Sequence, residues 1–299
     1  MGTGGWAYFP VESGSRLQAY SRAFNFVEVN STFYEYPDPE QLELWRRTVP
    51  SSFTFSVRCH QDLTHRIGLK PISEAYQVLN QMINYCNILR APFLVFETPA
   101  TYTLTDQVVE DAQAFFSSSN LRGVRLIWEN RAPMTSKAQS MMQNSNIVHS
   151  VDLSRQEPLF ASDVLYTRLF GKGKHNIYQF SDEELEEIAH KVLNSKAKTV
   201  ALSYHGVRMN TDALRFNSYL ATGSFPSITR LTGVAAAKAA LAEDAKFPAS
   251  RQALVEDQGW KIFDATSGKR LRLSEWLVQI PDKVYDSVDD VVEALGENQ

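Results

Sequence analysis

The chain has 299 residues, of which 43% are hydrophobic and 21% are charged, the balance of a soluble globular protein. Its 30 Lys and Arg residues and 34 Asp and Glu residues give a net charge of −4, so no basic excess indicates binding to a nucleic-acid backbone or an anionic membrane. Two cysteines, Cys59 and Cys86, are too few for a disulfide scaffold or a tetrahedral thiolate metal site, and they favour a reducing compartment.

The amino-terminal segment MGTGGWAY has neither the basic region nor the apolar core of a secretion signal. No apolar run in the sequence approaches the length that a membrane-spanning helix needs. We therefore expect a cytoplasmic protein that does not enter a membrane.

Eight short segments have the composition of strands, because they are rich in β-branched and aromatic residues and most are followed by a segment with helical spacing. The predicted strands are Gly2–Gly5, Phe26–Asn30, Phe53–Arg58, Phe93–Glu97, Val124–Glu129, Ile147–Asp152, Val164–Leu169 and Thr199–Ser203. The predicted helices are Ser15–Phe24, Pro39–Thr48, Ile72–Arg90, Thr105–Ser117, Thr135–Gln143, Ser181–Asn194 and Thr211–Leu220.

This alternation requires parallel strands joined by right-handed crossovers, and eight such units without a long interruption favour a closed barrel. The predicted fold class is therefore α/β, a (β/α)8 TIM-type barrel with a small C-terminal helical appendage. Only about a dozen residues separate the sixth and seventh strands, which is near the minimum for a crossover that contains a helix. We expect a loop or one short turn at that point.

The sequence changes character after Leu220. The stretch ATGSFPSITR has the composition of a linker, an Ala-rich helix is expected near Val234–Asp244, and a helical tail ends in PDKVYDSVDDVVEALG. We predict a barrel over residues 1–222 and a small helical domain over residues 229–299. So short a domain holds only a small core, and we expect it to pack on the barrel or a partner. The apolar residues expected in that packing are Trp260, Phe263, Trp276 and Leu277.

Polar residues lie at the carboxyl ends of most predicted strands, where barrels carry their functional groups. The stretch FVEVNSTFYEYP is the clearest case, because Glu28 interrupts a strand that is otherwise apolar. A buried carboxylate is costly unless a cation or several donors meet it, so Glu28 is either paired structurally or kept for chemistry. The other strand-end residues are Trp6, Tyr8, Asn30, Arg58, His60, Glu97, Glu129, Asn130, Arg131, Asp152, Arg168, Tyr204 and His205.

Several ordered motifs resemble those of one known family. GTGGWAY, VEVNSTFY, THRIGL, WENR and YTRLFG followed by YQFSDEELEEIA are similar to motifs of the domain-of-unknown-function 72 (YecE-like) family, across roughly residues 1–220. The resemblance implies a TIM-type barrel and marks as site residues Trp6, Tyr8, Glu28, Asn30, Thr32, Tyr34, His65, Glu129, Asp152, Arg168 and Gly171. The eighth-strand segment SYHGVRMNTDAL departs from the family pattern. The tail Phe247–Gly296 is similar to domain-of-unknown-function 2795.

A metal site is one alternative, because the strand ends supply ligand types that barrel isomerases and phosphodiesterases use. Those candidate ligands are His60, His65, Glu97, Glu129, His149, Asp152 and His205. The sequence has no HExxH spacing, and Arg58, Arg131 and Arg168 supply the positive charge that a metal would otherwise bring. No cofactor is therefore predicted, and a divalent metal is kept as the alternative.

The segment GKGKH, Gly171–His175, follows the seventh strand, where barrels often bind phosphate through loop amides. A flexible, solvated lysine loop is the competing interpretation. Arg168 lies just before this segment and favours binding, because a guanidinium makes bidentate contacts with phosphate or carboxylate.

General acid–base catalysis suits these residues best, since no Ser lies in a nucleophile elbow. The catalytic candidates are Glu28, Glu129, Asp152 and His65. The substrate-binding candidates are Trp6, Tyr8, Asn30, Tyr34, Arg58, Arg131, Arg168, Gly171 and Lys172. We predict an enzyme, a hydrolase or an isomerase, that acts on a small anionic, phosphorylated or polyhydroxylated substrate. The alternatives are a nucleic-acid-processing or nucleic-acid-binding protein, which the near-neutral charge disfavours, and a non-catalytic ligand sensor.

Overall fold

The computed structural model describes residues 1–296, and within them the chain forms two compact units. The first unit contains Met1–Leu169 and Asn194–Tyr204, and the second contains Phe170–Leu193 and the chain from His205 onward. The predicted domains, 1–222 and 229–299, divide the chain differently, because two helices that follow the last barrel strands group with the C-terminal segment. The division into those domains stays a prediction.

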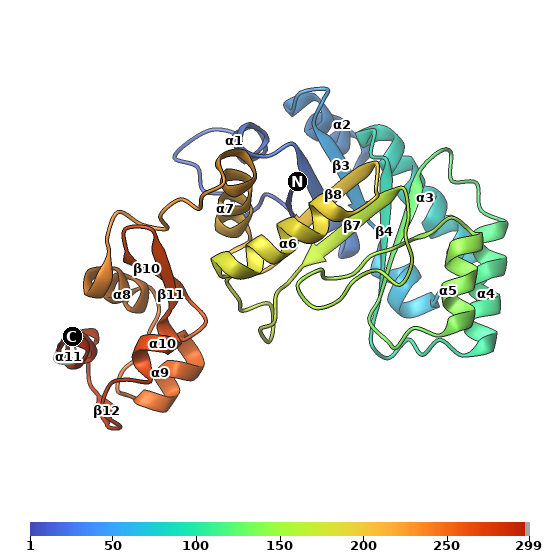
Figure 1. The fold of residues 1–299 in the computed structure, drawn as a ribbon. Helices are drawn as coiled ribbons and strands as arrows, with labels where there is room; N and C mark the ends of the chain where they lie inside the picture. Colours follow the sequence, from blue (N-terminus) through green and yellow to red (C-terminus); the bar gives the residue numbers. More distant parts are fainter. Residues whose placement is uncertain (297–299) are drawn as a thin grey trace. The chain divides into compact units, whose positions relative to one another are not determined.

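Eight parallel strands form the centre of the first unit (Figure 1). They are β1 (Gly2–Thr3), β2 (Phe26–Val29), β3 (Thr54–Arg58), β4 (Phe93–Thr98), β5 (Arg125–Asn130), β6 (Val148–His149), β7 (Val164–Leu169) and β8 (Thr199–Tyr204). Their order in the sheet is β6-β5-β4-β3-β2-β1-β8-β7. A parallel bridge between Val151 and Thr167 joins the β6 and β7 ends, and the Arg168 amide donates to the Val151 carbonyl at 3.3 Å. The barrel is therefore nearly closed, and the predicted fold class is confirmed.

Five helices follow the first five strands: α1 (Arg16–Ala23), α2 (Pro39–Thr48), α3 (Ser73–Leu89), α4 (Asp106–Ser117) and α5 (Ser136–Asn144). Local sequence explains where they begin, since the side chains of Ser15, Thr105 and Thr135 accept hydrogen bonds from amides of the first helical turn. Pro39 occupies the first turn of α2, where its missing N–H costs nothing. Residues 150–163, between β6 and β7, contain no helix, which confirms the short connection predicted there.

An apolar layer fills the part of the barrel nearest the amino ends of the strands. Phe26, Phe93, Val95, Ile127, Val148, Tyr166 and Ala201 pack together as one buried cluster, and they come from six of the eight strands. Side chains alternate along a strand, so the residues two positions further along point to the same face. Those residues include Glu28 on β2, Glu97 on β4 and Glu129 on β5. The fold thus directs these carboxylates into the barrel, above the apolar layer.

The second unit is mainly helical and also contains two antiparallel strand pairs, β10 with β11 and β12 with β9, that the sequence analysis did not predict. Its elements are α6 (Asp182–Asn194), α7 (Met209–Thr222), α8 (Gly233–Ala242), β9 (Ala249–Ser250), α9 (Arg251–Gln258), β10 (Ile262–Thr266), β11 (Lys269–Arg272), α10 (Leu273–Leu277), β12 (Val284–Tyr285) and α11 (Val288–Gly296). Phe263 and Leu277 lie in its buried core with Trp276 packed against it, whereas Trp260 is half-buried beside Arg208 and Lys261.

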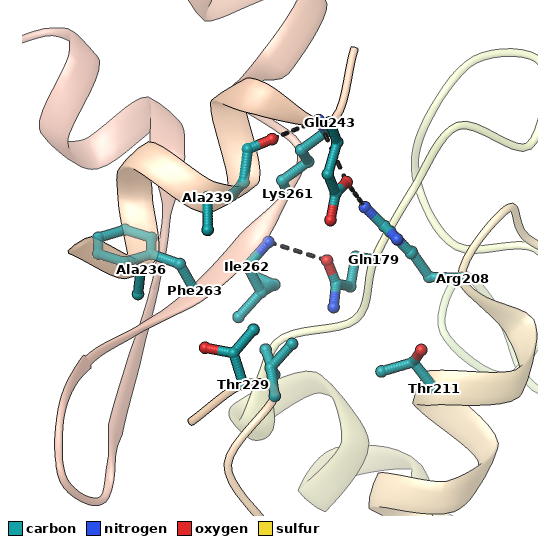
Figure 2. A pocket seen from close by; sticks show the side chains of 12 residues that line it. Gln179, Arg208, Thr211, Thr229, Ala236, Ala239, Glu243, Lys261, Ile262 and Phe263 are labelled. Atoms are coloured by element: carbon teal, nitrogen blue, oxygen red, sulfur yellow. Dashed lines mark hydrogen bonds and ion pairs between the residues drawn. The ribbon is translucent and has the colours of Figure 1, made fainter. Parts of the chain in front are cut away.

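A small cavity of about 60 Å³ lies within this unit, between α8, β10 and the segment before α6 (Figure 2). The Ile262 amide donates to Gln179 Oε1 at 2.9 Å on one side of it. Lys261 is buried, and its Nζ donates to Asp244 Oδ1 at 2.6 Å and to the Ala240 carbonyl at 2.7 Å. The Gln179 side chain thus connects β10 to the residues that precede α6.

Arg272 on β11 makes the largest set of these connections. Its Nη1 donates to the carbonyls of Gln179 at 3.0 Å and Trp260 at 3.1 Å, and its Nη2 donates to the Tyr178 hydroxyl and to Glu184, both at 2.8 Å.

We expect Arg272→Ala to lower the free energy of unfolding of the second unit by about 2 kcal/mol, because partly buried acceptors lose a charged donor. Urea denaturation of the full chain measures this. The exposed Arg230→Ala is the control, and equal stabilities of the two variants would contradict the expectation.

Candidate functional site

A network of buried charges occupies the carboxyl end of the barrel. Arg168 on β7 and Glu28 on β2 lie deepest, with 1% and 0% of their side chains exposed. Arg168 Nε donates to both Glu28 oxygens at 3.1 and 3.2 Å, and its Nη2 lies 3.0 Å from Glu28 Oε1. Glu28 Oε2 also accepts a hydrogen bond from the Tyr166 hydroxyl at 2.8 Å, which in turn lies 2.7 Å from Ser56 Oγ. Glu28 is therefore paired bidentately, and its burial is compensated.

The other end of the Arg168 guanidinium joins two more carboxylates. Arg168 Nη1 lies 2.6 Å from Glu97 Oε2 and 2.5 Å from Glu129 Oε2. Two further guanidinium groups complete the network, since Arg58 Nη2 donates to Glu97 Oε2 at 2.6 Å and Arg131 Nη2 lies 3.1 Å from Glu97 Oε1. Arg131 Nε also lies 3.3 Å from Glu129 Oε1. Three carboxylates and three guanidinium groups thus alternate across one end of the barrel.

These contacts favour the charged forms of Glu97 and Arg168. Burial favours the neutral form of Glu97, but the guanidinium groups of Arg168, Arg58 and Arg131 outweigh burial and hold its pKa below the usual value. Burial alone would lower the pKa of Arg168, whereas its three carboxylate partners raise it well above the usual value. For Arg58, burial and the nearby Arg168 lower the pKa more than the carboxylates raise it. The network is accordingly a set of ion pairs with fixed hydrogen bonds.

Exposed side chains lie above this buried layer. His65 is carried by a π-helical turn, Asp62–Ile67, and its ring meets the edge of the Phe33 ring at a centroid distance of 4.9 Å. The Arg58 guanidinium lies over the same Phe33 ring at 3.8 Å, and the Tyr34 ring packs on it at 4.9 Å. Phe33 thus positions Arg58, Tyr34 and His65 around one buried aromatic ring.

His65 is sensitive to the charges of the network. Desolvation by neighbouring protein atoms lowers the pKa of its imidazole, Arg58 and Arg131 lower it further, and Glu97 acts in the opposite direction. The side chain of His65 is exposed, and 44% of the Arg131 side chain is exposed. The solvent-facing part of the site therefore combines an imidazole of lowered pKa with a guanidinium that two carboxylates hold in place.

The structure brings together Glu28, Glu129, Arg58, Arg131, Arg168 and Asn30 from the predicted site. Asn30 Oδ1 accepts a hydrogen bond from Arg58 Nη1 at 3.1 Å, and its amide donates to the Gly4 carbonyl at 3.2 Å. Asp152 Oδ1 instead accepts from the Ser154 amide at 2.9 Å and the Ser154 hydroxyl at 2.6 Å, within its own turn. Its catalytic role stays a prediction.

The remaining predicted binding residues lie elsewhere or belong to the second unit. Trp6 packs edge-on against Trp45 of α2 at 5.0 Å, and Tyr8 is largely exposed. Gly171 and Lys172 lie in the second unit, where Lys172 Nζ is 3.0 Å from Glu184 Oε1. Gly171 has a φ of +76° and the Tyr178 ring lies against it, so a larger residue would not fit there. The anion-binding roles of these two residues stay predictions.

Sequence reasoning missed several members of the network. Glu97 was recognised as a strand-end residue but was not assigned to the site, although it contacts all three guanidinium groups. Tyr166 and Ser56, which support Glu28 from below, were not considered. Alternation was the available signal, because Glu97 follows the buried Val95 by two positions in the same way that Glu28 follows Phe26.

Neither a cluster of metal ligands nor a membrane-spanning helix occurs in the part of the chain that the structure describes. Across residues 1–296, no group of three His, Cys, Asp or Glu side chains is placed to hold a metal ion. In the same residues, every helix is too short or too polar to cross a membrane.

Comparison with known proteins places the chain in a family. The model of the family described as "Protein of unknown function DUF72" matches residues 1–227. The chain belongs to the DUF72 family. YunF, a UPF0759 protein of Bacillus subtilis, is 26% identical over 110 residues, which are 33% of this chain and 39% of YunF. YecE, a UPF0759 protein of Escherichia coli K12, is 35% identical over 54 residues, which are 18% of this chain and 20% of YecE. The matches thus span well under half of each curated relative.

Solved structures of DUF72 proteins share the fold. The DUF72 protein from Thermotoga maritima matches with a TM-score of 0.57 at 20% identity, covering 74% of this chain and 98% of that one. The DUF72 protein from Enterococcus faecalis matches with a TM-score of 0.59 at 13% identity, covering 77% and 98%. At these identities the likeness concerns the fold alone, and it agrees with the barrel seen here.

Proposed function

We propose that this protein is a cytoplasmic enzyme that uses acid–base chemistry, as a hydrolase or an isomerase, on a small anionic substrate at the carboxyl end of the barrel. One observation carries the proposal: the half-exposed Arg131 is held by Glu97 at 3.1 Å and by Glu129 at 3.3 Å beside an exposed histidine of lowered pKa. An anion-binding donor and a proton-transfer group are thereby placed at the same end of the barrel.

Arg131 is the group that meets the anionic part of the substrate. Its guanidinium is fixed from below and faces solvent, so it can bind a phosphate or carboxylate without first losing side-chain entropy. The buried Arg168 has a different role, because its guanidinium is enclosed by Glu28, Glu97 and Glu129. It positions Glu97 and Glu129, and these in turn position Arg131.

His65 is the group that transfers a proton. Its lowered pKa keeps the imidazole neutral at pH 7, which is the form that acts as a general base. Glu129, with 13% of its side chain exposed, is the second candidate for this role. Asn30 and the exposed Tyr34 add hydrogen-bonding groups next to Arg58 and Phe33, which suits a phosphorylated or polyhydroxylated substrate.

The charge balance of the site does not favour the nucleic-acid alternative. Proteins that bind nucleic acid carry an excess of positive charge at the binding surface. In this network, three carboxylates balance the charge of the three guanidinium groups. A site without net charge selects a ligand by the geometry of its donors. That selection is expected of a pocket for one small substrate.

The proposal is tested with Arg131→Gln and His65→Gln. We expect Arg131→Gln to weaken the binding of inorganic phosphate about tenfold by calorimetry, since one charge-assisted contact is lost. His65→Gln should leave phosphate affinity nearly unchanged and reduce turnover about a hundredfold on any substrate found by screening phosphate monoesters and sugar phosphates. In addition, the His65 pKa measured by NMR should lie below 6.5 and should rise in Arg131→Gln, because a nearby positive charge is removed.

Arg125→Gln is the matched control, because Arg125 lies at the amino end of the same strand that Arg131 follows. Phosphate affinity and the His65 pKa should both be unaffected in it. A His65 pKa at or above 6.5, or equal phosphate affinities in Arg131→Gln and Arg125→Gln, would contradict the proposed roles.

A further inference from the structure

A second site lies on the flank of the first unit, apart from the charge network. A cleft of about 520 Å³ is bounded by the first residues of α1 and by one face of α2. Its volume falls in the range of small-molecule sites, which is roughly 300–1,000 Å³. None of the residues of the charge network lines it.

Two tryptophans supply the aromatic part of the cleft. The Trp6 and Trp45 rings meet edge to face at a centroid distance of 5.0 Å, and both side chains are only partly buried. Leu44 beside them is 51% exposed. Half-exposed indoles next to an exposed leucine form an apolar surface on which a planar ring can stack.

The polar part of the cleft is positively charged. Arg16 and Arg47 line it, and no Asp or Glu does. Arg47 pairs with Glu43 at 3.2 Å on the protein surface, and such an exposed pair is weak enough for the guanidinium to turn toward a ligand. Arg16 begins α1, so the partial positive charge of the helix amino end adds to its own charge.

We propose that this cleft binds a small anion that carries a planar aromatic ring, with a phosphate or carboxylate at Arg16 and Arg47 and the ring on Trp6 and Trp45. A neutral sugar fits less well, because it carries no anionic group that could pair with Arg16 and Arg47. Trp6, which the sequence assigned to the barrel mouth, packs against Trp45 of α2 and lines this cleft.

Calorimetry with four probes tests the chemical class. AMP combines a ring with a phosphate, 4-hydroxybenzoate combines a ring with a carboxylate, adenosine lacks the charge, and inorganic phosphate lacks the ring. At this cleft, we expect AMP or 4-hydroxybenzoate to bind at least tenfold more tightly than either adenosine or inorganic phosphate. The probe that binds shows whether the anionic group of the ligand is a phosphate or a carboxylate. If neither AMP nor 4-hydroxybenzoate binds, the proposal is overturned.

Two variants and one control locate the binding. Arg16→Gln and Trp45→Leu should each weaken the aromatic anion about tenfold, through loss of a charged contact and of stacking respectively. Arg22→Gln, which removes an exposed arginine from the last turn of the same helix, should not. The effects of Arg16→Gln and Trp45→Leu should be the same in a chain that also carries Arg131→Gln, so the cleft is tested separately from the barrel mouth. Equal affinities in Arg16→Gln and Arg22→Gln overturn the proposal.

NMR on the unmodified chain keeps the test independent of how the variants fold. The indole N–H signals of Trp6 and Trp45, assigned with Trp6→Phe and Trp45→Phe, should shift on addition of the probe that binds, while that of the buried Trp128 should not. Signals of Trp6 and Trp45 that stay in place while calorimetry reports binding would show that the ligand occupies another site, and they would overturn the proposal.

Discussion

Replacing Arg168 by alanine should lower the free energy of unfolding of the barrel by about 3–5 kcal/mol, because it removes the guanidinium that pairs with the buried Glu28 carboxylate. Glu28 is fully buried, and Arg168 is the guanidinium that pairs with it at 3.0 Å. Arg168→Ala also removes the contacts that join Glu28 to Glu97 and Glu129. Urea denaturation at pH 7 gives the change in free energy, with the exposed substitution Arg22→Ala as the reference.

The double substitution Glu28→Leu with Arg168→Met separates the cost of an unpaired charge from the value of the pair. Both charges are then absent, and the apolar side chains fill a similar volume, so most of the stability should return. Glu97 and Glu129 keep Arg131, and Glu97 also keeps Arg58. If the double variant is no more stable than Arg168→Ala, the unpaired Glu28 carboxylate is not the cause of the loss.

The barrel could be predicted because its strands and helices are marked locally. Capping residues such as Ser15 and Thr105 and apolar runs such as Phe93–Thr98 depend on neighbouring residues alone. The hairpin of β10 and β11 was missed because its second strand, KRLR, is partly exposed and lacks an apolar face. The contacts of the C-terminal segment with α6 could not be inferred, because they depend on long-range pairs such as Arg272 with Glu184.

The position of the candidate site at the carboxyl ends of the strands was predictable from the sequence. The pairing of its side chains with one another was less predictable. Glu28 was expected to be paired or catalytic, and the structure shows it paired with Arg168. A strand fixes which face a side chain takes, so the inward direction of Glu97 could have been inferred from Val95. The loops that follow the strands carry no such rule. The packing of Trp6 against Trp45 was therefore not predictable from its place after β1.

Mild acid should destabilise the protein through His149. This residue of β6 is 6% exposed, and its Nδ1 accepts a hydrogen bond from the Leu159 amide at 3.2 Å, which requires the neutral ring at that atom. Burial lowers the pKa of His149 to about 4, although Glu129 acts in the opposite direction. In the unfolded chain a histidine titrates near pH 6.5, roughly 2.5 units higher.

Between pH 6.5 and pH 4 the unfolded chain therefore binds a proton at position 149 that the folded chain does not bind. The stabilisation that neutral His149 contributes is fully present above pH 6.5 and is lost as the pH falls toward the folded pKa. The total loss in unfolding free energy is about 3 kcal/mol.

Other groups also titrate in this window, so the quantity to measure is the difference in unfolding free energy between the natural chain and His149→Asn at each pH. The Asn side-chain oxygen can accept the Leu159 amide, and Asn does not titrate. We expect the natural chain to lose stability relative to His149→Asn steadily over this range, whereas the exposed substitution His190→Asn should follow the natural chain. A constant difference between the natural chain and His149→Asn would mean that His149 takes up a proton as readily in the folded barrel as in the unfolded chain, and that its bond to Leu159 does not hold the ring neutral.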